Sequence, residues 1–277
     1  MQDLTSIKNV PSLNDYYRKL HFGFAAGRIG LPAERMEECT GHANFNAAEL
    51  PCEYFSGLTD AEKDKLRKRF AKLCCGNLFA PGLTSLVLSA GKIIRQEFVR
   101  TCDCMFRRLI AGGISCCSLD FSLIQTLQDD SQMKIMSALL KQLHPVMLET
   151  GMTVLLPVRL PLPEDDLQKK VTGFLRDQMI SGLKLRLEIY PHELKPDFSP
   201  ESLAGTLRLE TRSVLFCCNA DGGNRLLRAH LIPWLRYFSL NAFDGPFFFC
   251  PFSRDNRLAA AESEAFSKLI EEIHKAH

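Results

Sequence analysis

Residues 183–190 read Leu-Lys-Leu-Arg-Leu-Glu-Ile-Tyr, a strict alternation of apolar and polar side chains that predicts a β-strand. One face of this strand carries leucine and isoleucine, and the other carries Lys184, Arg186, Glu188 and Tyr190. We expect the apolar face to pack against helices and the charged face to point into the interior of the fold. Because isolated buried charges are costly, these side chains need charged partners on other strands.

Seven other segments resemble residues 183–190 in length and apolar content. The eight predicted strands lie at residues 20–24, 45–50, 77–80, 114–120, 153–160, 183–190, 213–219 and 246–250. Successive strands start roughly 25 to 40 residues apart, which leaves room for one crossover helix in each gap. In most segments between these strands, apolar residues recur at helical spacing, which predicts helices there. Thr59 and Glu62 form the capping box that would begin one of these helices. Eight strand–helix units in 277 residues predict an α/β protein, a (β/α)8 TIM barrel, as a single domain over residues 1–277.

An open, doubly wound sheet is the alternative arrangement for alternating strands and helices. Such a sheet usually shows a glycine-rich phosphate-binding turn after its first strand. Residues 22–28 read Phe-Gly-Phe-Ala-Ala-Gly-Arg and lack the third glycine of that turn. The barrel is therefore the favoured fold.

The charge balance, the apolar runs and the cysteine content of the sequence indicate which partners and which cellular location to expect. The 34 Lys and Arg nearly balance the 32 Asp and Glu, so we expect no nucleic-acid partner, which would require an excess of clustered cations. No apolar run of about 18 residues occurs, so we expect no membrane span. The chain begins without the basic and apolar regions of a secretory signal. Its 11 cysteines include three adjacent pairs and no zinc-binding spacing, so we expect a reducing, cytoplasmic location.

Polar residues collect where the predicted strands end, which is where TIM barrels carry their sites. We predict that four of them bind substrate: Arg28, Asp120, Arg159 and Asn219. Arg159 lies on the strand next to Glu188, and we expect the two to form a buried ion pair. Loss of that pair would cost on the order of 3 kcal/mol. The charged face is interpreted either as a structural ion-pair network or as a pocket for a polyhydroxylated or anionic ligand.

Three short segments carry a family resemblance. Residues 22–32, 48–51 and 78–82 include Phe-Gly-Phe, Gly-Arg-Ile-Gly-Leu-Pro, Ala-Glu-Leu-Pro and Leu-Phe-Ala-Pro-Gly. In this order they resemble the xylose isomerase-like TIM barrels, the sugar phosphate isomerase/epimerase superfamily. The resemblance implies a barrel that holds a divalent metal (Mn, Mg or Zn) and moves a proton between adjacent carbons of a sugar.

The resemblance also implies roles for individual residues. Glu49 and Glu188 would be the catalytic acid/base pair, and His192 and Asp221 would be metal ligands. The carboxylates that the family carries at the ends of strands five and eight have no counterpart in residues 153–160 or 246–250, so the metal site is degenerate. With few histidines near the strand ends, the zinc-dependent endonuclease activity found in the same superfamily is disfavoured.

Three functions stay open at this point. The first is a sugar, sugar phosphate or sugar acid isomerase or epimerase. The second is a carbohydrate-binding barrel that has lost the metal centre and does not catalyse. The third is a scaffold with a sealed interior. For the first two, the expected partner is a small carbohydrate or sugar phosphate, and the resemblance allows a homodimer.

Overall fold

The fold is described from a computed structural model of the chain. The structure describes residues 17, 19–29, 31–79, 83–121, 123–162, 165–194, 198–203, 205–218, 224–251 and 257–276.

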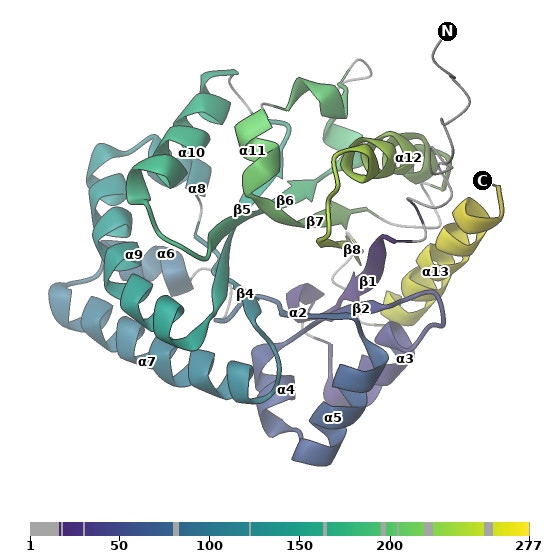
Figure 1. The fold of residues 1–277 in the computed structure, drawn as a ribbon, viewed down its shortest axis with the longest axis horizontal. Helices are drawn as coiled ribbons and strands as arrows, with labels where there is room; N and C mark the ends of the chain where they lie inside the picture. The colour runs from purple at the N-terminus through teal and green to yellow at the C-terminus, as the bar shows by residue number, and fades with distance from the viewer. Residues whose placement is uncertain are drawn as a thin grey trace, which may run out of the picture.

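Eight parallel strands close into a barrel in the order of the sequence, with β1 paired to both β2 and β8. Figure 1 shows the strands gathered in the middle of the molecule and the helices arranged around them. The closed ring confirms the predicted TIM barrel. The strands are β1 (His21–Ala25), β2 (Ala47–Leu50), β3 (Lys72–Cys75), β4 (Cys116–Ser118), β5 (Thr153–Leu160), β6 (Leu183–Ile189), β7 (Thr211–Cys217) and β8 (Pro246–Cys250).

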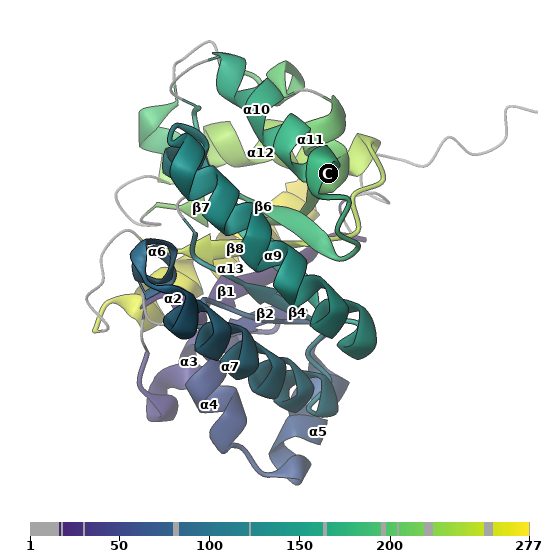
Figure 2. The ribbon, with the colours of Figure 1, turned by 90° about the vertical axis from the view of Figure 1, so that its left-hand side faces the viewer.

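Helices connect each strand to the next and cover the outside of the ring. Long helices α7 and α9 lie side by side on this outer surface (Figure 2). The α-helices are α2 (Ala26–Ile29), α3 (Met36–Thr40), α4 (Cys52–Gly57), α5 (Asp60–Arg69), α6 (Leu83–Ser89), α7 (Lys92–Ala111), α8 (Leu123–Leu127), α9 (Asp130–Thr150), α10 (Asp165–Gln178), α11 (Gly205–Glu210), α12 (Asn224–Leu240) and α13 (Ala259–Ala276). Short 3-10 turns are η1 (Ala33–Arg35), η2 (Pro191–Glu193) and η3 (Pro200–Ser202). No helix in these described ranges is both long enough and apolar enough to cross a bilayer.

The strands with the clearest sequence patterns lie where they were predicted. β5 and β8 coincide with the predicted segments, and β6 ends one residue early, at Ile189. The predicted third strand at residues 77–80 is wrong, because β3 runs from Lys72 to Cys75. Its four residues pair with β2 one for one, and residues 77–79, the described part of the predicted segment, follow the strand as irregular backbone. A strand that begins with lysine and ends with two cysteines gives little apolar signal of its own.

Two predictions about helices have different outcomes. The capping box at Thr59 is present, since the Thr59 hydroxyl accepts from the Glu62 amide and Glu62 accepts from the Thr59 amide. The proline at position 233 is expected from the sequence to break or kink its helix, and it does not break it, because α12 continues through Pro233. Buried Leu231, Trp234 and Leu235 flank the proline, and their packing offsets the backbone hydrogen bond that proline cannot donate.

The apolar core lies between the ring and its helices. Phe249 of β8 is fully buried, and its ring stacks on Phe266 of α13 with 4.5 Å between centroids. Gly23 of β1 is so close to β2 that a Cβ atom there would overlap the carbonyl oxygen of Ala47. A glycine is therefore required where β1 meets β2. Arg186 and Glu188, the charged residues of β6 predicted to face the interior, are both buried.

Candidate functional site

A pocket opens at the carboxyl ends of β4, β5 and β6. Its volume is about 440 Å³, within the range of small-molecule sites. The polar residues that line it are Asp120, Gln125, Arg159, Glu188 and Glu193, and the apolar ones are Phe121, Leu123, Ile124, Pro157 and Pro161. Three of the eight residues predicted to form the site (Asp120, Arg159 and Glu188) therefore meet at one pocket, although their roles there stay predictions.

Arg159 has a partner other than the predicted one. It lies beside Glu188 in the register of β5 and β6, but its side chain turns outward to Glu193 of η2. Its Nε donates to Glu193 Oε2 at 3.1 Å, and its guanidinium lies over the Tyr190 ring, 4.1 Å from the centroid. The hydrogen bond to Glu193 raises the pKa of Arg159. The predicted Arg159–Glu188 pair is wrong, because a carboxylate and an aromatic ring at the half-exposed rim hold the guanidinium instead.

Arg186 of β6 supplies the positive charge beside Glu188. Its side chain is fully buried, and it donates to Glu188 Oε1 at 3.0 Å and to Glu49 Oε2 at 3.2 Å. It also donates to Asn77 Oδ1 at 3.4 Å, from the segment that follows β3. The alternation of β6 predicts that Arg186 lies on the interior face, but no sequence pattern assigns it a role.

Glu49 is buried and is not part of the wall of the pocket. It is 1% exposed and is not among the residues that line the pocket, whereas Glu188 is 5% exposed and is. The second oxygen of Glu49, Oε1, accepts no hydrogen bond from the described residues and lies against Gly76, where a Cβ atom would be 2.8 Å away. The two carboxylates assigned to acid/base catalysis are thus both bound to one guanidinium, and only Glu188 faces the pocket.

The residues present do not fit the metal centre that the resemblance implies. Across the described ranges, no group of three or more His, Cys, Asp or Glu side chains is placed to hold a metal ion. His192 lies in η2, 44% exposed, with its Nε2 3.5 Å from Glu193 Oε1. A guanidinium stands between Glu49 and Glu188, which are buried carboxylates of β2 and β6. We therefore derive no step through a metal.

Three predicted site residues cannot be placed beside this pocket. Arg28 belongs to α2, directly after β1, and its side chain lies outside the description. Asn219 and Asp221 also lie outside the described residues, in the segment after β7. Their predicted roles in binding substrate and metal stay predictions.

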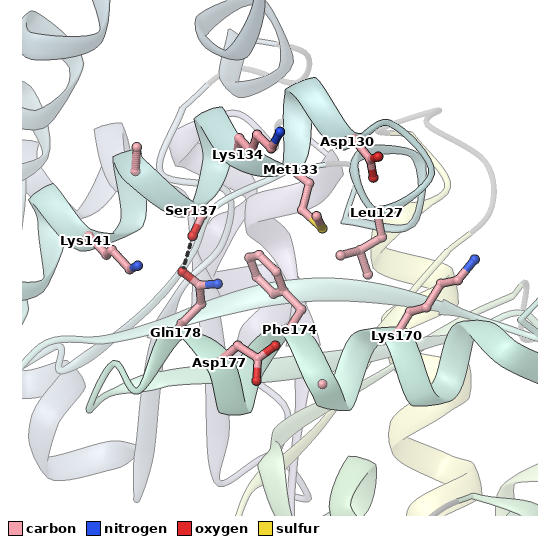
Figure 3. Close-up of a pocket in the computed structure, with 12 residues that line it drawn as sticks. Leu127, Asp130, Met133, Lys134, Ser137, Lys141, Lys170, Phe174, Asp177 and Gln178 are labelled. Carbon is pink, nitrogen blue, oxygen red and sulfur yellow. Dashed lines mark hydrogen bonds between the residues drawn. The ribbon is translucent and has the colours of Figure 1, made fainter.

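A larger groove of about 610 Å³ lies on the outer flank of the barrel, between α9 and α10. Figure 3 shows Phe174 and Met133 at its floor and a hydrogen bond of 2.6 Å from the Ser137 hydroxyl to Gln178 Oε1. Lys134, Lys141 and Lys170 stand along its edges. Because TIM barrels carry their chemistry at the strand ends, the smaller pocket is the better candidate for function.

Comparisons with known proteins find solved structures that resemble this chain over nearly its whole length. No family model matches the sequence, and no curated protein matches it. Among solved structures, a D-tagatose 3-epimerase-like protein aligns over 93% of this chain and 99% of its own, with TM-score 0.65 and 15% identity. D-allulose 3-epimerase from Methylomonas sp. aligns over 91% and 97%, with TM-score 0.68 and 13% identity. An AP endonuclease of family 2 from Brucella melitensis aligns over 90% and 98%, with TM-score 0.59 and 14% identity.

These similarities cover nearly the whole chain. Because the sequence identities are only 13–15%, they support a shared fold and nothing more specific. The closed ring of eight parallel strands agrees with them. The chain has the fold of the xylose isomerase-like TIM barrels.

Proposed function

We propose that this barrel binds a neutral carbohydrate in the pocket at the ends of β4, β5 and β6. The observation that carries the proposal is the lining of that pocket. Hydrogen-bonding groups from Asp120, Gln125 and Glu188 face the same space as apolar side chains of Phe121 and Ile124. A sugar needs both kinds of contact, because its hydroxyl groups require hydrogen-bond partners and its C–H faces pack on apolar surface.

The charges in the pocket favour a neutral sugar over a sugar phosphate. Three carboxylates (Asp120, Glu188 and Glu193) line it against one guanidinium, that of Arg159. Arg159 is already bound to Glu193 and covered on one side by Tyr190. A phosphate group would face an excess of negative charge and would need an arginine that is already engaged.

A ligand screen tests the binding proposal. Thermal melts with neutral ketoses, aldoses and their phosphates should show stabilisation by at least one neutral monosaccharide and none by its phosphate. Asp120→Asn keeps the shape of the side chain and removes its charge, so the affinity for that sugar should fall about tenfold. Lys141→Ala, in the flank groove, is the matched control and should leave the affinity unchanged. Preferential binding of phosphates, or an Asp120→Asn variant that binds as well as wild type, would contradict the proposal.

Sugar epimerisation is the second candidate. It is favoured by Glu188, a carboxylate that lines the pocket, and by structural similarity to a D-tagatose 3-epimerase-like protein and to D-allulose 3-epimerase. Epimerisation through proton transfer needs an acid/base group within reach of the reacting carbon, and Glu188 with Asp120 would be that pair here, in place of Glu188 with Glu49. Incubation with ketohexoses in deuterium oxide, followed by NMR, should show exchange at carbon if the barrel is catalytic. Exchange that persists in Glu188→Gln would remove Glu188 from that role.

A homodimer and a cytoplasmic location also belong to the proposal. The first rests on the resemblance and the second on the cysteine content of the sequence. Light scattering during size-exclusion chromatography should give a mass of two chains if the dimer forms, and a mass of one chain would overturn it.

A further inference from the structure

The charged cluster at the centre of the ring consists of Glu49, Arg186 and Glu188. One guanidinium lies between two carboxylates that come from different strands, β2 and β6. Relative exposures of 0% for Arg186, 1% for Glu49 and 5% for Glu188 place the cluster out of water. Charges interact strongly where water is excluded, and a buried charge is costly unless an opposite charge lies beside it.

The guanidinium contributes the two things that a divalent cation would contribute at this position. It supplies positive charge between the carboxylates, and its several N–H donors fix the direction of each carboxylate oxygen. Divalent cations need a cage of several oxygen or nitrogen ligands. Beyond the two carboxylates, the described strand position next to Glu49 adds no oxygen or nitrogen ligand, so these residues would hold a divalent cation only weakly. In register with Glu49 lies Cys74, whose pKa is raised by its contact with Cys116 and by burial, so that the thiol keeps its proton.

We propose that Arg186 takes the place of a metal ion in this barrel. The guanidinium holds Glu49 and Glu188 in position, and the pocket above it is organised without a divalent cation. Arg186 is a positioning residue in this proposal, since it is fully buried and reaches the pocket through Glu188. The proposal does not depend on which ligand the pocket binds.

The proposal makes opposite predictions for the wild type and for a variant without the guanidinium. Wild-type protein should be purified without stoichiometric Mn, Mg or Zn by elemental analysis. Its melting temperature should be unchanged by EDTA and by millimolar Mn²⁺. Arg186→Met keeps most of the side-chain length and removes the guanidinium from between the two carboxylates. Its melting temperature should fall, and millimolar Mn²⁺ should raise it by about 3 °C or more.

Two further variants separate metal binding from general effects. Arg186→Lys keeps one positive charge, so its melting temperature should stay insensitive to Mn²⁺. The triple variant Glu49→Gln, Arg186→Met, Glu188→Gln has no buried charge in the cluster, so it should fold and show no response to Mn²⁺. If Arg186→Met alone does not fold, a folded triple variant still shows that the guanidinium compensates the carboxylates.

Two results would overturn the proposal. One is a stoichiometric divalent metal in the wild type, or a wild-type melting temperature that falls in EDTA. The other is an Arg186→Met variant that folds and responds to Mn²⁺ no more than the triple variant does. A wild-type barrel that binds no sugar would leave these results intact, so failure of the binding proposal and failure of this one are distinguishable.

Discussion

Arg186 and Glu49 lie 137 residues apart in the sequence, and the hydrogen bond between them crosses the interior of the barrel. β2 and β6 are four strands apart in either direction around the closed ring, so they lie opposite each other. The contact is possible because the long arginine side chain spans an interior in which Gly23 and Ala47 provide little bulk. Arg186 therefore ties the two sides of the barrel together at its centre.

Removal of the guanidinium should be among the most damaging single substitutions in the interior. Arg186→Met leaves two buried carboxylates without their cation, and we expect the free energy of unfolding to fall by about 3–5 kcal/mol. Urea unfolding followed by circular dichroism measures this loss. The triple variant with Glu49→Gln and Glu188→Gln should recover most of it, because no charge is then stranded. A loss below about 1 kcal/mol in Arg186→Met would be typical of an exposed ion pair and would contradict the buried geometry.

Replacement of Arg159 should have a much smaller effect. Its side chain is 52% exposed and its partner Glu193 is 31% exposed, so water screens the pair. We expect Arg159→Ala to lower the free energy of unfolding by less than about 1 kcal/mol, even with the Tyr190 contact included. The measurement is the same urea titration, with Lys169→Ala as the control for loss of an exposed cation. A loss near 3 kcal/mol would restore the buried pair that the sequence predicted.

The thiols should differ sharply in reactivity. Of the 11 free cysteines, nine are buried, Cys116 is partly buried and Cys104 is exposed. Burial raises the pKa of the Cys39 thiol to about 11, and it raises the pKa of Cys102 and Cys218 as well. Because the thiolate is the reactive form, a disulfide reagent at pH 8 should modify one thiol per native chain quickly and the buried ones only after unfolding.

Cys104→Ser is the control for this experiment and should remove the fast phase. A fast phase of several thiols per chain would mean that the helices around the barrel open readily.

Two histidines should make stability depend on pH. Burial lowers the pKa of His42, and burial followed by the nearby Lys72 charge lowers that of His21. Both are therefore held neutral in the folded state, and the unfolded chain takes up protons first as the pH falls. Their contribution to stability is complete above the unfolded pKa of about 6.5 and is lost as the pH falls through the lowered folded pKa.

Urea unfolding between pH 7.5 and pH 5, an interval chosen to bracket the histidine range, measures this dependence. We expect the free energy of unfolding to fall across that interval, and we expect His42→Gln to flatten the slope. A variant with the wild-type slope would show that other groups control the acid response.

The sequence was sufficient for the architecture because the barrel repeats one unit eight times. Alternation over residues 183–190 and the apolar run at residues 246–250 located their strands nearly to the residue. β3 was misplaced because Lys72 and the two cysteines that end it are not distinctive of a strand. One wrong strand did not change the predicted fold, since the other seven segments still alternate with helices at the spacing of a (β/α)8 barrel.

The site could be predicted only in part, because its main contact depends on closure of the ring. Sequence spacing shows which residues are neighbours on adjacent strands, and that reasoning paired Arg159 with Glu188. It does not show which strands lie opposite each other or how far a side chain reaches across the interior. The competing partners of Arg159, Glu193 and Tyr190, follow β6 and were not expected to turn back over the rim.

The bond between Arg186 and Glu49 has a consequence for the evolution and engineering of the chain. Strands β1 to β4 and strands β5 to β8 form the two halves of the barrel, and each half carries one member of this bond. A gene fragment for β1 to β4 would carry Glu49 without its guanidinium, whereas a fragment for β5 to β8 would keep Arg186 with Glu188 and lack only the carboxylate on the opposite side. Duplicating the first half, or replacing the second with that of a relative lacking the arginine, should therefore fail unless the complementary residue moves with it.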